Sequence, residues 1–328
     1  MSTQAEATLT YRDAVNAAMD DALAADGSVI LMGEDVANEG GVFKTNAGLP
    51  EKYGERILVT PICENGFTGV ALGMAVMGMR PIVEIMFADF MPTASDAIIN
   101  QLPKYRYMSG GQFSVPVTMR VISGAGGRFG TQHSATGESW YMAQPGLHVA
   151  LAATPGSAYS LLTAAIRSND PVIVHEHKML YGVKGPVDRG AVAEIGKASI
   201  ERSGADITIV ASLLMVSRAL EAAEALAADG IEAEVIDLRW VRPLDMETIG
   251  ASVARTGRLL IAEEQWHDAG WGSTIISRLA QAGTTFAAPP ATVSLPHDQL
   301  IPYSPPLEDA FIPSAEHIAE AARASVRS

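Results

Sequence analysis

Two residues of this 328-residue chain have the type and the setting that chemistry requires, and the first is Glu64. It stands where a short apolar strand, expected to end at Ile62, gives way to an apolar helix. Ligands collect at the ends of strands in α/β sheets, and burial there perturbs the proton affinity of a carboxylate. The alternative is a structural first-turn glutamate, which the helix dipole favours. The residues alone leave both interpretations open.

The second residue is His133, within the loop sequence Gln132-His133-Ser134. A histidine can move protons near neutral pH, and polar neighbours can orient its ring; the alternative is an exposed loop side chain. The preceding glycines, at 124, 126, 127 and 130, follow a predicted strand. Their spacing does not match G-x-G-x-x-G, and no G-x-x-x-x-G-K-[ST] occurs, so neither a dinucleotide fingerprint nor a phosphate loop is predicted.

Two further groups of polar and aromatic residues are interpreted as structural. His175 and His177 share one face of a predicted strand, but zinc normally takes three or four protein ligands and no others are evident nearby. Trp266, His267 and Trp271 follow a strand in the second half of the chain. Exposed aromatic side chains among charges are typical of an interface, which we favour here over chemistry.

Strand and helix patterns alternate along the chain, which predicts crossover connections and largely parallel sheets. The fold class expected is α/β, with two domains that each contain a largely parallel sheet flanked by helices. The pattern loosens into Gly, Pro and charge between them. We therefore predict a first domain over 1–185, a linker over 186–204 and a second domain over 205–328. One helix is expected over 91–108.

Composition excludes several classes of protein. Apolar residues make up 48% of the chain and charged residues 18%, which suits a large core. The formal charge of −14 argues against nucleic acid and anionic membranes. The single cysteine, Cys63, excludes an internal disulfide and fits a reducing compartment. The glycine-rich run 65–79 is too short to span a membrane, and neither a signal-peptide nor a transit-peptide pattern is found, so a cytoplasmic location is expected.

Sequence stretches distributed over essentially the whole chain resemble a known family. It is the beta subunit of the thiamine-diphosphate-dependent first component of 2-oxoacid dehydrogenase complexes, with pyruvate, branched-chain and acetoin versions, and more distantly transketolase. The matching stretches are MGEDV, TPICENGFTGVALGMA, RPIVEIMFADF, INQLPKYRYMSGG, QHS, PGLHV, AIRSNDPVIVHEHKMLYG, VIDLRWVRPLD and LEDAFIPS. The resemblance implies a transketolase-like pyrimidine-binding domain followed by a transketolase C-terminal-like domain.

The resemblance also implies roles for individual residues. Glu64 matches the carboxylate that binds N1′ of the aminopyrimidine and promotes the imino tautomer, and Ile62, Met86 and Phe90 match positions around that ring. His133 matches a histidine near the reacting carbon, which serves proton transfer and acyl handover to lipoamide.

Some members of the family hold a potassium ion on main-chain carbonyls. The matching positions in this sequence are near Val117, Ala165, Ser168 and Asp170. The types of residue at these positions vary, so this site is the least specific part of the resemblance.

Thiamine enzymes bind Mg²⁺ and the diphosphate with a GDG motif and a later Asn, and this chain has no GDG. The resemblance therefore implies an alpha subunit that carries this motif, an active site at the interface, an α₂β₂ assembly and a lipoyl-bearing acyltransferase core. The sequence ATGESWY after QHS departs from the family and places Glu138 and Ser139 near the pocket, which leaves the substrate open. The alternatives are a split transketolase-like ketol transferase and a non-catalytic nucleotide-binding subunit of an electron-transfer protein.

Overall fold

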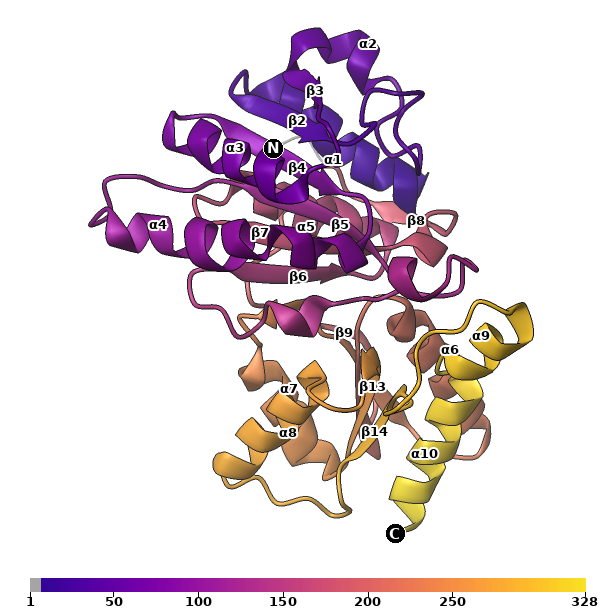
Figure 1. Cartoon of the computed structure of the whole chain (residues 1–328). Coiled ribbons are helices and arrows are strands. Elements are labelled where there is room, and N and C mark those ends of the chain that lie inside the picture. Colours follow the sequence, from indigo (N-terminus) through magenta and orange to yellow (C-terminus); the bar gives the residue numbers. More distant parts are fainter. Residues whose placement is uncertain (1–6) are drawn as a thin grey trace.

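The computed structural model describes residues 7–328, which form two α/β lobes stacked end to end (Figure 1). The first lobe is built on a seven-stranded sheet with the order β12-β6-β7-β5-β4-β2-β3, and the second on a five-stranded sheet with the order β14-β13-β10-β11-β9. All pairings in the first sheet are parallel except β12 with β6, and all in the second are parallel except β9 with β11. These two sheets confirm the predicted fold class.

The strands of the first sheet are β2 (Val29–Gly33), β3 (Ile57–Val59), β4 (Arg80–Ile85), β5 (Thr118–Ser123), β6 (His148–Ala152), β7 (Val172–His177) and β12 (Trp240–Arg242). Those of the second are β9 (Ser199–Arg202), β10 (Ile207–Ala211), β11 (Ala233–Asp237), β13 (Leu259–Trp266) and β14 (Ala291–Leu295). A small antiparallel ladder joins β1 (Ala7–Thr10) to β8 (Lys184–Val187).

The helices are α1 (Tyr11–Ala25), α2 (Leu49–Tyr53), α3 (Glu64–Val76), α4 (Leu102–Met108), α5 (Pro155–Arg167), α6 (Leu214–Ala228), α7 (Met246–Thr256), α8 (Trp271–Gln281), α9 (Pro305–Phe311) and α10 (Ala315–Arg327). Four of the starts follow from capping side chains, at Thr10 (α1), Thr154 (α5), Asp245 (α7) and Ser314 (α10). Thr10 accepts from the Asp13 N–H, and Thr154 forms a capping box with Ser157.

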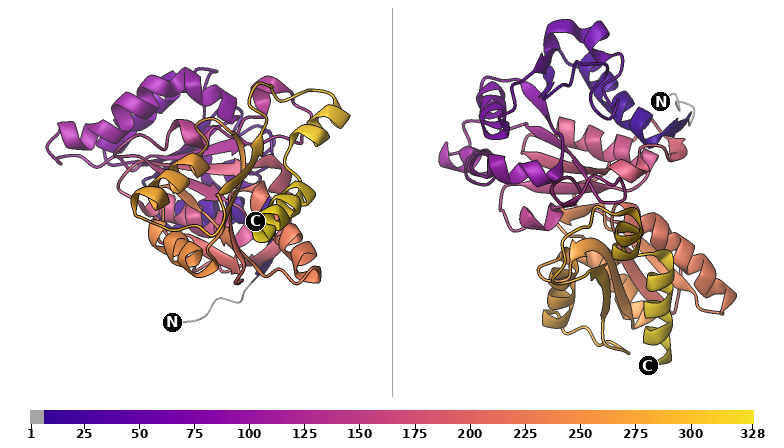
Figure 2. Two further views of the ribbon diagram at one scale, coloured as in Figure 1. Left: turned by 90° about the horizontal axis from the view of Figure 1, so that it is seen from below. Right: turned by 45° about the vertical axis from the view of Figure 1, so that its right-hand side comes forward.

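Helices cover both faces of each sheet, as the two views of Figure 2 show. In the first lobe α1 and α5 pack together on one face, and α3 packs against β4 on the other. In the second lobe α6 and α10 pack on one face and α7 and α8 on the other. One apolar core cluster contains both Phe67 of the first lobe and Ile249 of the second, so the two lobes share buried surface.

The helix expected over 91–108 is instead three short segments. A 3₁₀ segment (Ala88–Ala94) leads through a π-helical turn (Asp96–Gln101) into α4. Pro92 and Pro103 each lack the N–H that a continuous helix requires, and Pro103 lies in the first turn of α4. The interruption lies beside Glu64, because the Ala97 N–H donates to the side chain of Asn65 (3.3 Å).

The segment predicted as a linker over 186–204 does not remain irregular. It begins with the end of β8, and β9 within it pairs with β11 as an edge strand of the second sheet. In addition, β12 leaves the second half of the chain and pairs with β6 of the first sheet. The predicted domain boundaries stay predictions, and the chain crosses between the two sheets more than once. In residues 7–328, no helix combines the length and the apolar character that crossing a bilayer requires.

Candidate active site

β3 ends at Val59 rather than at the predicted Ile62, and Glu64 begins α3 after the turn that follows, at the edge of the first sheet. Its side chain is buried, at 9% exposure, and one carboxylate oxygen, Oε2, accepts a hydrogen bond from the Thr93 hydroxyl (3.0 Å). The Thr93 hydroxyl also donates to the carbonyl of Phe90 (2.7 Å), which ties the 3₁₀ segment to the start of α3.

A second buried carboxylate, Glu34, lies near Glu64. It follows β2, the neighbour of β3 in the sheet, and its Oε1 has no hydrogen-bond partner. Burial raises the pKa of Glu34, and the nearby charges of Glu64 and Asp35 raise it further. The sequence prediction did not select Glu34, although its position directly after a predicted buried strand could have indicated a site residue. Two carboxylates that repel each other are typical of proton-transfer sites.

His133 and Phe90, which were predicted to belong to the same active site, lie in contact through their rings. The His133 ring lies edge-on to Phe87 (centroids 4.7 Å apart) and to Phe90 (5.3 Å). Because Thr93 joins Phe90 to Glu64, the two predicted catalytic residues lie on either side of the Phe90 segment. Phe87 and Phe129 extend the aromatic cluster.

Two charged side chains that the sequence prediction missed hold the His133 loop. Lys178 donates to the His133 carbonyl (2.7 Å), and Asp89 accepts from the Ala135 N–H (3.1 Å). Burial lowers the pKa of Lys178 to about 8, and burial raises the pKa of Asp89. The Lys178 ammonium also lies 5.5 Å from the ring centroid of Phe87, a cation–π distance. Two part-buried polar contacts therefore hold the backbone of the loop at His133 and at Ala135.

The same loop is joined to the second lobe. Glu264 accepts from the Ala125 N–H (2.6 Å) and pairs with His177 Nε2 (3.0 Å). Burial acts to raise the pKa of Glu264, but His177 and the Ala125 N–H outweigh it and hold that pKa below its usual value. Gly124 is required beside this pair, because a Cβ there would lie 1.9 Å from His177 Nε2 and the residue has φ +93°. Both ring nitrogens of His177 have protein partners, since Nδ1 accepts from the Met179 N–H (3.2 Å).

Ile62 and Met86, the other two residues predicted to bind the cofactor, are placed differently from Phe90. Ile62 lies in the turn before α3 with 85% of its surface exposed, and Met86 is half-buried after β4. The exposed side of α3 continues from Ile62 through Val70 and Met77. This surface is apolar and nothing in residues 7–328 covers it.

The carbonyls predicted to hold potassium each have a donor already. Val117 O accepts from the Val172 N–H (3.0 Å), Ala165 O from the Ser168 N–H (3.1 Å) and Asp170 O from the Ser168 hydroxyl (2.9 Å). The guanidinium of Arg80 donates to Ser168 O (2.5 Å) and so supplies a positive charge there. Potassium binding stays a prediction.

Glu138, expected near the pocket, is fully buried where the lobes meet, and its Oε2 accepts from Gln265 (2.7 Å). Its nearness to the pocket stays a prediction, whereas the expectation for Trp271 needs correction. Burial, with repulsion from Glu263 and Glu264, raises the pKa of Glu138 to about 8. Trp271, expected at an exposed interface, is fully buried at the start of α8. The neighbouring glycines give the reason, since a Cβ at position 270 would lie 2.3 Å from Glu263 Oε1.

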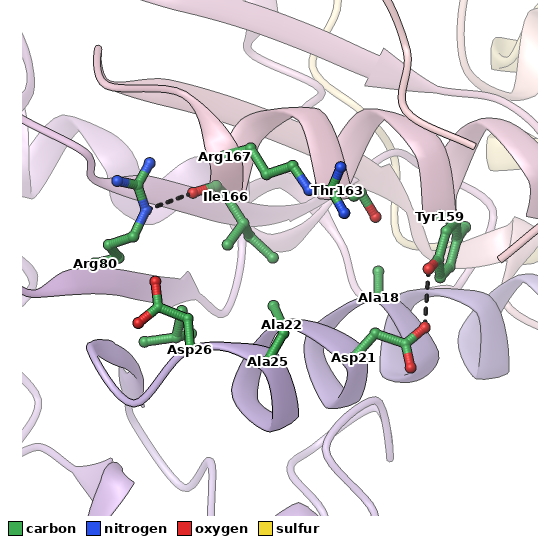
Figure 3. Close-up of a pocket in the computed structure, with 11 residues that line it drawn as sticks. Ala18, Asp21, Ala22, Ala25, Asp26, Arg80, Tyr159, Thr163, Ile166 and Arg167 are labelled. Carbon is green, nitrogen blue, oxygen red and sulfur yellow. Dashed lines mark hydrogen bonds between the residues drawn. The ribbon is translucent and has the colours of Figure 1, made fainter. Parts of the chain in front are cut away.

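A cavity of about 310 Å³ lies between α1 and α5 and has no part in this site (Figure 3). Figure 3 shows Tyr159 bonded to Asp21 across the cavity (2.8 Å) and Arg80 bonded to the carbonyl of Ile166 (3.0 Å). Neither Glu64 nor His133 lines it, and they lie at the carboxyl ends of the strands instead.

Comparison with known proteins agrees with this geometry. Residues 7–184 match the transketolase pyrimidine-binding domain, and residues 196–318 match the transketolase C-terminal domain. The chain is 44% identical to the beta subunit of acetoin:2,6-dichlorophenolindophenol oxidoreductase from Cupriavidus necator, over 97% of this chain and 98% of that protein. It is also 44% identical to the mitochondrial pyruvate dehydrogenase E1 component subunit beta-2 of Oryza sativa subsp. japonica, over 96% and 85%. The chain belongs to the E1 beta subunit family.

Solved structures show that the E1 beta fold of this chain is that of transketolase. A split-gene transketolase, described as an inactive beta4 tetramer, superposes with a TM-score of 0.80 at 23% identity, covering 97% of this chain and 98% of that one. A transketolase from Pichia stipitis gives a TM-score of 0.70 at 18% identity, over 99% of this chain and 47% of that one. As an E1 beta subunit, the chain carries its candidate active site at the carboxyl edge of the pyrimidine-domain sheet.

Proposed function

We propose that this E1 beta subunit works with an alpha subunit as a thiamine-diphosphate enzyme. The enzyme decarboxylates a 2-oxoacid or cleaves acetoin, and it transfers the acyl group to lipoamide. The observation that carries the proposal is the buried Glu64 at the start of α3, which Thr93 links to Phe90, whose ring in turn contacts His133. The relatives at 44% identity, whose names specify acetoin and pyruvate, support this reaction class over ketol transfer.

The residues present fit the aminopyrimidine of the cofactor. Only Oε2 of Glu64 accepts a hydrogen bond within residues 7–328, so Oε1 is available to bind a ring nitrogen. Phe90 supplies an aromatic edge next to it, and the exposed Ile62 supplies apolar surface. When bound, thiamine diphosphate supplies the nucleophilic carbon for the reaction. The role proposed for Glu64 is to bind the pyrimidine and hold a proton at its carboxylate.

His133 is proposed to move a proton near the reacting carbon and to assist acyl handover. An imidazole serves this purpose only if its position is fixed. Lys178 binds the carbonyl of His133 and Asp89 binds the N–H of Ala135, and the rings of Phe87 and Phe90 restrict the orientation of the imidazole. These contacts leave the imidazole half-buried, so it remains accessible to a substrate.

Two features support the proposed partners: the chain has no GDG motif, and it has an exposed apolar surface along α3. Because this chain has no GDG motif, we propose that an alpha subunit binds Mg²⁺ and the diphosphate. We propose that the two subunits form an α₂β₂ assembly, which delivers acyl groups to a lipoyl-bearing acyltransferase core. The apolar surface of Ile62, Val70 and Met77 is available for such a partner. We propose a cytoplasmic location. Potassium binding at the carbonyls named above stays a prediction.

Co-expression with an alpha chain that carries GDG and its Asn tests the proposal. Calorimetry is expected to show tight binding of thiamine diphosphate with Mg²⁺ to the assembly and weak binding to the beta subunit alone. Turnover is then measured with pyruvate, branched-chain oxoacids and acetoin, first with an artificial electron acceptor and then with a lipoylated domain. Full binding by the beta subunit alone, or the absence of turnover with every one of these substrates, would contradict the proposal.

A further inference from the structure

Three exposed side chains of the second lobe converge away from the candidate active site. Ligand atoms of His267, Asp268 and His297 all lie within 4.8 Å of one another. The Nδ1 atoms of both histidines face Asp268 Oδ1, at 3.6 Å from His267 and 3.3 Å from His297. The two imidazole rings lie side by side, with centroids 4.3 Å apart. In residues 7–328, this is the one group of three or more His, Cys, Asp or Glu side chains with metal-binding spacing.

The fold itself brings these residues together. His267 and Asp268 follow β13, and His297 follows β14 by one residue after Pro296. The two strands are parallel neighbours, with Trp266 opposite Leu295 in the register, so their carboxyl ends meet at one edge. The Trp266 indole N–H also donates to the Gln299 carbonyl (3.0 Å), which holds the two loops against each other.

Two imidazoles and one carboxylate are a recurrent ligand set for divalent transition metals, whereas Mg²⁺ prefers oxygen ligands alone. We propose that His267, Asp268 and His297 bind one divalent transition metal ion, of which Zn²⁺ is the best probe. Three protein ligands leave a further position for water. The site is separate from the Mg²⁺ expected with the cofactor, and it does not depend on the proposed function.

The side chains are free to adopt the shorter spacing that a bound ion imposes. Their exposed fractions are 49% for His267, 83% for Asp268 and 53% for His297. Ligands at about 2.0–2.2 Å from zinc must approach one another more closely than 4.8 Å, which small rotations of exposed side chains achieve. An ion bound in this way would tie the loop after β13 to the loop after β14.

The second of these loops contacts the candidate active site, which gives the metal a structural role. The Ile301 carbonyl accepts from the Thr131 hydroxyl (3.0 Å), and Thr131 begins the short helix that ends at His133. A metal ion that fixes residues 297–301 would therefore also stabilise Thr131 and the short helix that ends at His133. The role inferred is stabilisation of this segment, without direct contact with substrate.

The test uses the untagged full-length chain, freed of metal with EDTA and titrated with ZnCl₂ in a calorimeter. One Zn²⁺ per chain is expected, with no competition from an excess of Mg²⁺. His267→Ala and His297→Ala are each expected to weaken binding by at least about tenfold, as is Asp268→Asn. Zn²⁺ is expected to raise the Tm of the wild type but not that of His297→Ala.

Two matched controls separate this site from other surface groups. Asp298→Asn removes the same charge as Asp268→Asn one residue beyond His297, and His317→Ala removes an exposed histidine from the same surface hollow. Both are expected to bind Zn²⁺ like the wild type. The proposal is overturned if no Zn²⁺ binds, if both triad histidines can be removed without effect, or if a control variant loses binding equally. Binding without a rise in Tm overturns the bracing role.

Discussion

The ammonium of Lys178 donates to the main-chain carbonyl of His133 (2.7 Å) from a largely buried position. Phe87 and Phe129 flank it, each with a ring centroid 5.5 Å from the nitrogen. A buried lysine is costly unless it is satisfied, and burial lowers the pKa of this one to about 8. Lys178 therefore acts on the candidate catalytic histidine through its backbone.

Lys178→Met tests this positioning role. Methionine fills the aromatic space but cannot donate to the His133 carbonyl, so the imidazole loses its fixed position. We expect kcat/KM of the assembled enzyme to fall about tenfold, or about 1.4 kcal/mol, mainly through kcat. Lys184→Met, at an exposed lysine of β8, is the control and is expected to change neither constant. Unchanged kinetics in Lys178→Met would show that the contact is only structural.

Glu64→Gln tests the proposed binding of the pyrimidine. The amide preserves the shape and the bond to Thr93 but cannot hold the proton as a carboxylate does. We expect an assembled, folded enzyme with well under a tenth of the wild-type turnover, a loss of more than about 1.4 kcal/mol. Steady-state assays and circular dichroism measure the two properties. Glu51→Gln, in the exposed part of α2, serves as the control, and near-normal turnover in Glu64→Gln would contradict the role.

Glu138→Gln tests the buried carboxyl where the lobes meet. Its pKa is about 8 in the folded chain and near the ordinary 4.5 when unfolded, so the folded state binds more protons between these values. Its contribution to stability is full below about pH 4.5 and is lost as the pH rises through about 8, by as much as about 1.4 kcal/mol per pH unit. We expect urea unfolding to show a smaller loss of stability between pH 5.5 and 7.5 in the variant. Glu194→Gln, at an exposed glutamate, should keep the wild-type slope.

Val70→Lys tests the exposed face of α3 as a subunit contact. Val70 is 51% exposed and lies among Ile62 and Met77, so a charge there leaves the single chain intact but disfavours burial against a partner. We expect sedimentation to show impaired assembly with the alpha subunit and an unchanged Tm for the isolated chain. Val192→Lys, at a similarly exposed valine, is the matched control. Normal assembly of Val70→Lys would place the interface elsewhere.

Local pattern predicted most of the fold, because strand and helix periods and their stop signals are local properties. The α/β alternation is confirmed. The break between 91 and 108 was missed although Pro92 and Pro103 are visible in the sequence. The edge strand β9 was missed because a short exposed strand depends on its pairing with β11. Trp271 was assigned to the surface because its burial depends on glycines packing against Glu263.

The candidate site was predictable only in part. Glu64, Phe90 and His133 were selected through a resemblance to a family, and the structure brings them near one another. The sequence prediction did not select Glu34, Asp89 or Lys178, because their roles depend on burial and on contacts with residues distant in the sequence. Ile62 lies on a surface that is exposed in the single chain. The residues that contact Ile62 in an assembly therefore cannot be derived from this sequence or from this one subunit.

The antiparallel pairing of β12 with β6 has a consequence for any attempt to express the halves separately. A fragment that stops at residue 204 lacks Trp240–Arg242. In that fragment β6 would be an exposed edge strand, whose unpaired backbone N–H and C=O groups could pair with another molecule. The complementary fragment would carry a fully buried tryptophan, Trp240, with nothing to cover it. The two halves of this chain are interlocked, and neither is a finished protein by itself.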